Sequence, residues 1–249
     1  MKYVFTIFSL CICTLAFAQI SGKVTYEEKM DLHRNLPPER QEMKDMIPQY
    51  NTAVFELFFQ DIESIYQPKK ADETEVATNS GNSQMTMRFG RDNRVVYKNL
   101  DTDVMIDSRE FMQKQFLITG PPTVRKWKIG TKQKEILGHK CMEANFRVDS
   151  VTTLVAWFAP DISNSNGPAD YQGLPGLILG VDVNEGLRTI TATEIKMEQV
   201  DPAIIVAPTK GKEVTAEEFE AIRKEKMKEM QLQHGGGSGQ GPQMIMIRN

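Results

Sequence analysis

The sequence predicts an α+β protein that is mostly β, with a strongly curved antiparallel sheet or half-open barrel and one or two packed helices. Short segments of alternating or continuous apolar character, rich in β-branched and aromatic residues, recur between polar or Gly/Pro turns. Several links between them, at 90–92, 149–150 and 184–186, are short enough for hairpins. Strands and helices do not alternate along the chain, which argues against a doubly wound sheet or a TIM barrel.

The predicted strands begin just after the N-terminal segment and continue through most of the chain. Each is a run of β-forming residues bounded by turn residues. We expect strands near 22–30, 52–60, 85–90, 93–98, 102–107, 115–119, 124–129, 133–137, 140–148, 151–158, 177–184 and 187–197, and a further one at 203–206.

Two segments predict helices. Pro37-Pro38 precedes a short helix over 39–46, and Pro48 ends it. Thr215 and Glu218 form a capping box at the start of a second, strongly charged helix that Gly235 terminates. We therefore expect one or two helices beside the sheet.

The ends of the chain differ from the predicted β-rich domain, which spans 19–234. Residues 1–18 have a basic Lys2, an apolar stretch and an Ala16-Phe17-Ala18 cleavage site, which predicts a signal peptide and export to the periplasm. The apolar run is shorter than the roughly 18 residues of a membrane-spanning helix. Residues 235–249 are a Gly-rich linker with an apolar tail, and 67–84 reads as a solvated loop. Association with the outer membrane is left open.

Composition excludes several classes of partner. The 249 residues are 40% hydrophobic and 25% charged, as in an ordinary globular protein. The formal net charge is −3 and there is no polybasic block, which argues against nucleic acid and anionic membrane surfaces. No catalytic fingerprint such as a nucleophile elbow or a phosphate loop is present. We therefore favour a protein that is not an enzyme.

One group of residues, around Cys141, contains the soft ligands and the thiol that some metal sites and nucleophiles use. Cys141 is the only cysteine left after signal cleavage, and strand alternation places it on the same side as His139. With Met142 these are residue types that a thiol nucleophile or a Cu(I) site uses, so copper is the cofactor to consider, if any. A lone cysteine is more often buried and inert, and methionine is a common core filler.

The most individual stretch is the 160–176 connection. It is long for a compact domain, and such loops often bind ligands. We consider Tyr171, Leu174, Pro175 and Gly176 as candidate binding-loop residues. Gly173, Pro175 and Gly176 also fit a structural turn, in which Leu174–Leu177 adopts type II geometry. In the competing interpretation the loop is a packed corner that covers one end of the sheet.

The hexapeptide at 173–178, GLPGLI, carries a family resemblance. Together with its surroundings it makes the chain similar to the GLPGLI family of exported Gram-negative proteins, whose function is uncharacterised. The resemblance implies an exported, β-rich protein but no reaction. Further matching segments are Val24-Thr25-Tyr26-Glu27, Phe55-Glu56-Leu57-Phe58-Phe59, Ser64-Ile65-Tyr66, Trp127-Lys128-Ile129, Ile136-Leu137-Gly138-His139-Lys140-Cys141, Ala156-Trp157-Phe158 and Gly167-Pro168.

The function that these observations favour is a non-catalytic periplasmic binding or carrier module. Its ligand would be an apolar small molecule or another envelope protein, bound on the concave face of the sheet or by the 160–176 loop. The alternative is a thiol- or copper-dependent redox or metal-binding protein centred on Cys141.

Overall fold

The computed structural model describes residues 20–36, 38–70 and 93–234, and within them the chain forms one open twelve-stranded sheet. This confirms the predicted α+β, mostly β fold. The strand order is β12-β6-β5-β4-β3-β2-β1-β11-β10-β9-β8-β7. The strands are β1 (Ser21–Asp31), β2 (Tyr50–Gln60), β3 (Glu63–Pro68), β4 (Val95–Asn99), β5 (Val104–Phe111), β6 (Lys114–Gly120), β7 (Lys128–Ile136), β8 (His139–Arg147), β9 (Thr153–Ala159), β10 (Leu177–Val183), β11 (Arg188–Lys196) and β12 (Lys212–Val214).

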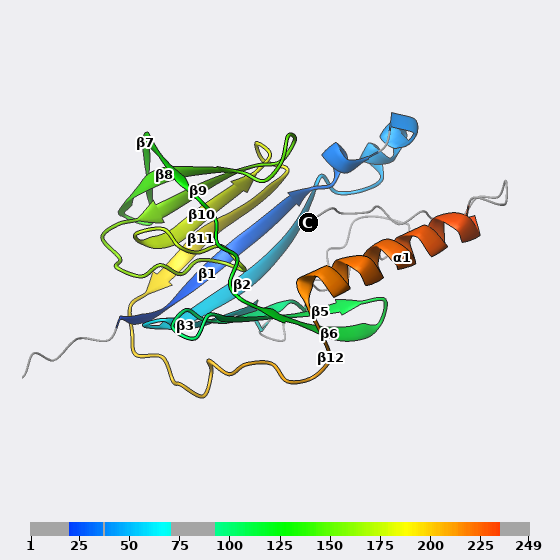
Figure 1. Ribbon diagram of the computed structural model, residues 1–249. Helices are drawn as coiled ribbons and strands as arrows, with labels where there is room; N and C mark the ends of the chain where they lie inside the picture. Colours follow the sequence, from blue (N-terminus) through cyan, green and yellow to red (C-terminus); the bar gives the residue numbers. More distant parts are fainter. Residues whose placement is uncertain (1–19, 37, 71–92, 235–249) are drawn as a thin grey trace, which may run out of the picture.

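The sheet consists of two meanders joined at β1. Strands β1 to β6 each pair with the next along the chain, and so do β7 to β11. The first strand of one meander pairs with the last of the other, β1 with β11, and all these pairs are antiparallel. In Figure 1 the long strands β1 and β2 cross the middle of the molecule, with β7–β11 on one side and β3, β5, β6 and β12 on the other. Only β12 pairs in parallel among the described strands, with β6.

One face of the sheet carries the main core, because side chains alternate along each strand. Val24 lies opposite Leu57 and Tyr26 opposite Phe55, and all four are buried. Tyr66 extends this layer by stacking on Phe55, with ring centroids 4.9 Å apart. We call this the inner face and the opposite one the outer face.

The helix α1 (Ala216–His234) begins at the predicted capping box. The Glu218 N–H donates to Thr215 Oγ1 (3.2 Å), and the Thr215 N–H donates to Glu218 Oε2 (2.8 Å). Phe219 packs edge-to-face on Phe116 of β6, and the rest of the helix runs outward from the sheet (Figure 1). The second expected helix is 3-10 rather than α, as η2 (Pro38–Asp45), and a shorter turn η1 (His33–Asn35) precedes it.

Several strand predictions need correction. The segments 124–129 and 133–137 contribute to one irregular strand, β7, because its pairing with β8 shifts between Ile129 and Gln133. Residues 203–206 form turns and no strand, since Ile205 is buried against the outer face instead of pairing. The sequence reading missed β3 and β12. The predicted strand 85–90, the 90–92 link, most of the 67–84 loop, the signal peptide and the tail 235–249 lie outside the described residues.

No helix in the described part of the chain is long and apolar enough to cross a membrane.

Candidate functional site

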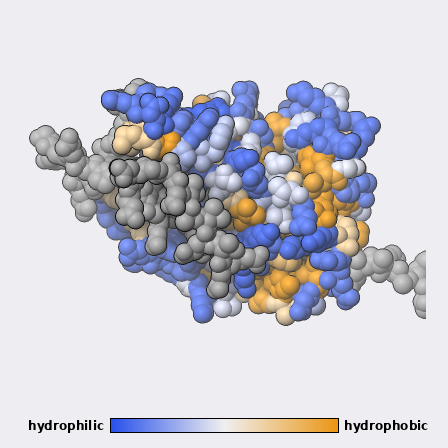
Figure 2. Space-filling model, turned by 180° about the vertical axis from the view of Figure 1, so that it is seen from behind, coloured by the Kyte–Doolittle hydropathy of each residue, from blue (hydrophilic) through white to orange (hydrophobic). Residues whose placement is uncertain are grey.

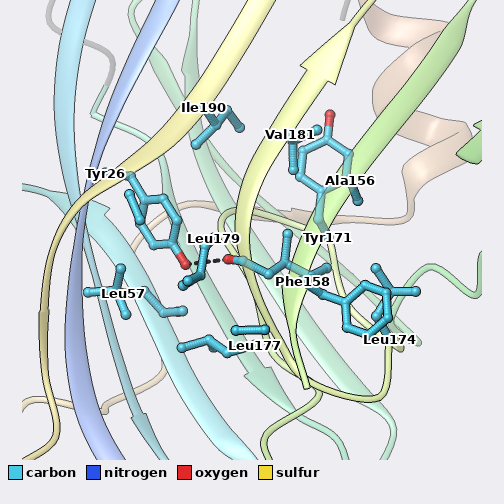
Figure 3. Close-up of a cluster of buried hydrophobic side chains, with 14 of the residues drawn as sticks. Tyr26, Leu57, Ala156, Phe158, Tyr171, Leu174, Leu177, Leu179, Val181 and Ile190 are labelled. Atoms are coloured by element: carbon cyan, nitrogen blue, oxygen red, sulfur yellow. Dashed lines mark hydrogen bonds between the residues drawn. The ribbon is translucent and has the colours of Figure 1, made fainter. Parts of the chain in front are cut away.

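The connection from β9 to β10, residues 160–176, lies against the inner face of the sheet. Ile162, Ala169, Tyr171 and Leu174 are all buried in the main core cluster. Figure 3 shows Tyr171 beside Ala156 and Val181, and Leu174 beside Phe158. Two of the four candidate binding-loop residues therefore pack inward, while Pro175 is exposed.

The turn that contains the hexapeptide is tighter than the predicted type II turn. The Gly176 N–H donates to Leu174 O (2.8 Å), while the Leu177 N–H donates to Ile162 O (3.1 Å) instead of closing a four-residue turn. Gly173 and Gly176 both have positive φ, 85° and 151°. A Cβ on Gly176 would overlap the Ala159 carbonyl oxygen and lie 2.9 Å from Pro160 Cα. Gly176 is thus required by both conformation and space.

Buried charges hold the loop to the first meander. Asp170 forms ion pairs with Arg125 and with Arg94, the latter at 3.5 Å, and Arg94 also binds Asp107 (2.8 Å). Burial by itself would raise the pKa of Asp170, but Arg125 and Arg94 outweigh it and hold the pKa well below its usual range. The Arg125 guanidinium also lies 4.8 Å from the centre of the Tyr171 ring. The loop is therefore fixed by paired charges from two connecting segments, one before β4 and one before β7.

Lys98 of β4 holds the same loop through hydrogen bonds to two of its carbonyl groups. Its ammonium group is fully buried and donates to Gly167 O (2.9 Å) and Tyr171 O (3.4 Å). Burial lowers the pKa of Lys98 to about 7. A lysine with such a pKa is a candidate for chemistry, but here the group is shielded by the loop it holds.

The three residues of the soft-ligand constellation lie on β8 and do not converge. Cys141 is fully buried and donates weakly to His139 O (3.6 Å). The His139 ring instead contacts Asp161, with Nδ1 2.6 Å from Oδ2. Met142 pairs with Phe158, and as the next strand residue it points to the face opposite Cys141.

The Cys141 thiol is not in the environment of a reactive cysteine. Burial is the main cause that raises its pKa to about 11, so it stays protonated at neutral pH. Within the described ranges, no group of three or more His, Cys, Asp or Glu side chains is placed to hold a metal ion.

A groove on the outer face is the site that sequence reasoning missed. It has a volume of about 530 Å³ and lies between the strands β1–β3 and the turn at 203–204. Lys23, Glu56 and Phe58 alternate with the buried Val24, Leu57 and Phe59, so they point outward. Its described lining residues are Lys23, Glu56, Phe58, Gln67, Lys69, Lys70, Ala203 and Ile204. The sequence signals were the Lys69-Lys70 pair and the apolar 203–206 segment, which lie far apart in the chain.

The charges of this groove are unequally matched. Lys23 pairs with Glu56 at 2.7 Å, and its ammonium lies 5.5 Å from the centre of the Phe58 ring. Within the described part of the chain, Lys69 and Lys70 have no carboxylate within 4.0 Å. The nearby Glu194 is bonded to Lys196 at 2.9 Å, and Lys196 is the main cause that lowers the pKa of Glu194, with smaller contributions from Lys23 and Lys69. The described lining residues of the groove therefore include three lysines and one carboxylate, beside apolar side chains.

Comparison with known families matches residues 147–180 to a family described as "Protein of unknown function (Porph_ging)". The matched segment contains the whole hexapeptide. The GLPGLI family is not matched, so membership in it is not confirmed and the similarity is to an uncharacterised family. No curated protein matches the chain.

Solved structures give a likeness of fold. The chain is similar to PNGF-II in two crystal forms, with a TM-score of 0.53 in each and 14% and 15% sequence identity. The alignments cover 82% of this chain but only 33% and 32% of the PNGF-II chains. The chain thus spans about a third of their length, and at this identity the likeness concerns the fold alone.

Proposed function

We propose that this protein is a non-catalytic binding module of the cell envelope, and that it holds its ligand in the groove on the outer face of β1–β3. The observation that carries the proposal is the pair Lys69 and Lys70, which line the groove without a carboxylate partner within the described residues. Unpaired charges beside accessible apolar groups are what a binding site offers to a ligand. The N-terminal sequence supports the envelope as its location.

The groove replaces the concave face as the favoured binding surface. The protein's own 160–176 loop packs against the inner face of the sheet, with Leu174 2% exposed and Asn166 fully buried. A ligand on the inner face would have to displace Asp170 from two arginines and Lys98 from two carbonyl groups. The outer groove needs no such rearrangement.

The chemistry of the groove favours binding over catalysis. The described residues that line it include no Ser, Cys or His, and its one carboxylate is already paired with Lys23. Lys98 and Cys141, two groups with perturbed pKa values, are buried elsewhere. No contact in the described residues favours the thiol- or copper-dependent alternative.

Site-directed photo-crosslinking tests this proposal. A photoreactive benzoylphenylalanine replaces Ile204 in the full chain, produced in the cells that make the protein naturally. We expect an adduct of defined mass from position 204 that disappears when Lys69→Glu and Lys70→Glu are added. The matched control places the probe at Val151, an exposed residue in the β8–β9 turn. Absence of an adduct at 204, or the same adducts from both positions, would refute the proposal.

A further inference from the structure

The charge of the groove selects the polarity of its ligand. Among the described residues that line the groove, Glu56 is the one carboxylate and it pairs with Lys23, so Lys69 and Lys70 add two further positive charges there. The backbone of Lys69 is anchored, since its N–H donates to Val54 O (2.9 Å). Both lysines are exposed. An acidic group can approach them without breaking an existing pair.

The wall of the groove formed by the turn at 203–204 is apolar and preformed. Ile204 is 37% exposed, but its neighbours Val200 and Ile205 are buried against Ile65 of β3. The turn is closed by the Ile204 N–H, which donates to Asp201 O (2.9 Å), and by the Ala203 N–H, which donates to Asp201 Oδ1 (2.9 Å). This turn therefore holds Ile204 facing the groove without further ordering on binding.

The size of the groove favours a small molecule over a protein partner. Its volume of about 530 Å³ falls within the roughly 300–1,000 Å³ of small-molecule sites. A stable protein interface would need a broad complementary surface. Where the described residues are visible from behind, hydrophobic patches lie among hydrophilic residues (Figure 2).

We infer that the ligand of this groove is an amphiphilic anion, in which an acidic headgroup contacts Lys69 and Lys70 and an apolar chain lies along Phe58 and Ile204. This inference rests on the proposed function and adds the ligand class to it. Either half alone would bind more weakly. An alkyl chain without a charge does not pair with the lysines, and a bare anion does not contact the apolar wall.

The test compares four probes on the full mature chain, each below its micellar concentration. Dodecyl phosphate and dodecanoate carry both halves, inorganic phosphate carries only the charge, and dodecyl maltoside only the chain. Binding is measured by calorimetry and by the NMR shift of the Ile204 methyl groups. We expect saturable binding of one or both amphiphilic anions, and the preferred one identifies phosphate or carboxylate as the headgroup. Both control probes should bind at least about tenfold more weakly.

Variants locate the binding. Lys69→Gln with Lys70→Gln should weaken it at least about fivefold, whereas Lys128→Gln with Lys140→Gln, at exposed positions on β7 and β8, should leave it unchanged. Equal binding of inorganic phosphate or of dodecyl maltoside would overturn the inference. A fifth probe, an oligoglutamate peptide, separates the two proposals: if it alone shifts the Ile204 methyl groups, the inference fails and the proposed function stands. If neither the amphiphiles nor that peptide binds and crosslinking at 204 is also negative, both fail.

Discussion

The inner and outer faces of the sheet both place charged groups beside apolar ones, but they do so differently. Under the 160–176 loop, Asp170, Asp107 and Arg94 are joined in a chain of ion pairs. In the outer groove, Lys69 and Lys70 remain exposed and without a carboxylate partner in the described ranges.

This difference separates structural from binding roles. Buried charges cost free energy unless they are paired, so the inner network exists to fix the loop. Exposed charges contribute little to stability, and in the proposed function Lys69 and Lys70, which have no carboxylate partner among the described residues, contact the ligand. Substitutions on the inner face should therefore change the free energy of unfolding, and those in the groove should change only binding.

The largest effect is expected at the turn of the loop. Gly176→Val should lower the free energy of unfolding by about 2–5 kcal/mol, because a β-branched residue is strained at positive φ and overlaps Ala159. Pro175→Ala, at an exposed position, should cost less than about 1 kcal/mol. Urea unfolding measures both. Leu174→Asp should also destabilise strongly, and an unchanged melting temperature for that variant would show that the loop is a docking surface after all.

The next largest effect is expected at Asp170, and it should depend on acidic pH. Asp170→Asn should cost about 3 kcal/mol at neutral pH, because Arg125 and Arg94 lose a buried partner. The folded pKa of Asp170 lies below its ordinary value of 3.8, so its contribution is present above about pH 4 and is lost as the pH falls further. The difference in free energy of unfolding between the wild type and Asp170→Asn should therefore become smaller below pH 4. A difference in free energy of unfolding that stays constant from pH 7 to pH 3 would contradict the stabilising role of these ion pairs.

Lys98 should give a pH dependence of the same sign as that of Asp170, but at neutral to alkaline pH. Burial lowers its pKa from 10.5 to about 7 in the folded protein, so between these values the unfolded chain binds one more proton. The free energy of unfolding should then rise with pH by about 1.4 kcal/mol per unit from this group. Lys98→Met has no proton to gain and should lack this slope. Unfolding curves at pH 7, 8 and 9 give the comparison, and parallel slopes for the two proteins would disprove it.

Cys141 belongs with the inner, structural class. Cys141→Ser should lower stability by about 1–2 kcal/mol, because a hydroxyl replaces a buried thiol. Crosslinking through position 204 should be unaffected. The native thiol should react slowly with a maleimide, and rapid labelling with normal stability would instead support the thiol-centred alternative.

The smallest effect is expected in the groove. Lys69→Gln with Lys70→Gln should change the free energy of unfolding by no more than about 0.5 kcal/mol, because exposed lysine side chains contribute little to stability. Thermal melting of the double variant tests this. A loss of several degrees would show that these lysines are structural and would remove the contrast between the two faces.

The sequence predicts the strands well where alternation is clear, as in β8, and the α1 capping box is confirmed atom by atom. It fails at β3 and β12, which are short and take their register from neighbours. It also fails at 203–206, where apolar residues pack on the sheet surface instead of joining it.

Site prediction from the sequence is limited by distance along the chain. The 160–176 loop was recognised from its length and its glycines, but its inward packing depends on Arg94, Lys98 and Arg125 in other elements. The groove joins Lys23, Lys69 and Ile204, which no local pattern connects. Such a site follows from the strand order, which the sequence alone did not provide.

The pairing of β1 with β11 also sets the order in which the chain can fold. Glu28 and Arg188, whose side chains are 2.7 Å apart, are separated by 160 positions. Each meander contains mostly local pairs and can form early, but the join must wait until nearly the whole chain is available, which makes folding slow. Until then β1 and β11 are open edges that can pair with other chains. Late joining therefore makes the chain before the β1–β11 pairing the stage most exposed to aggregation.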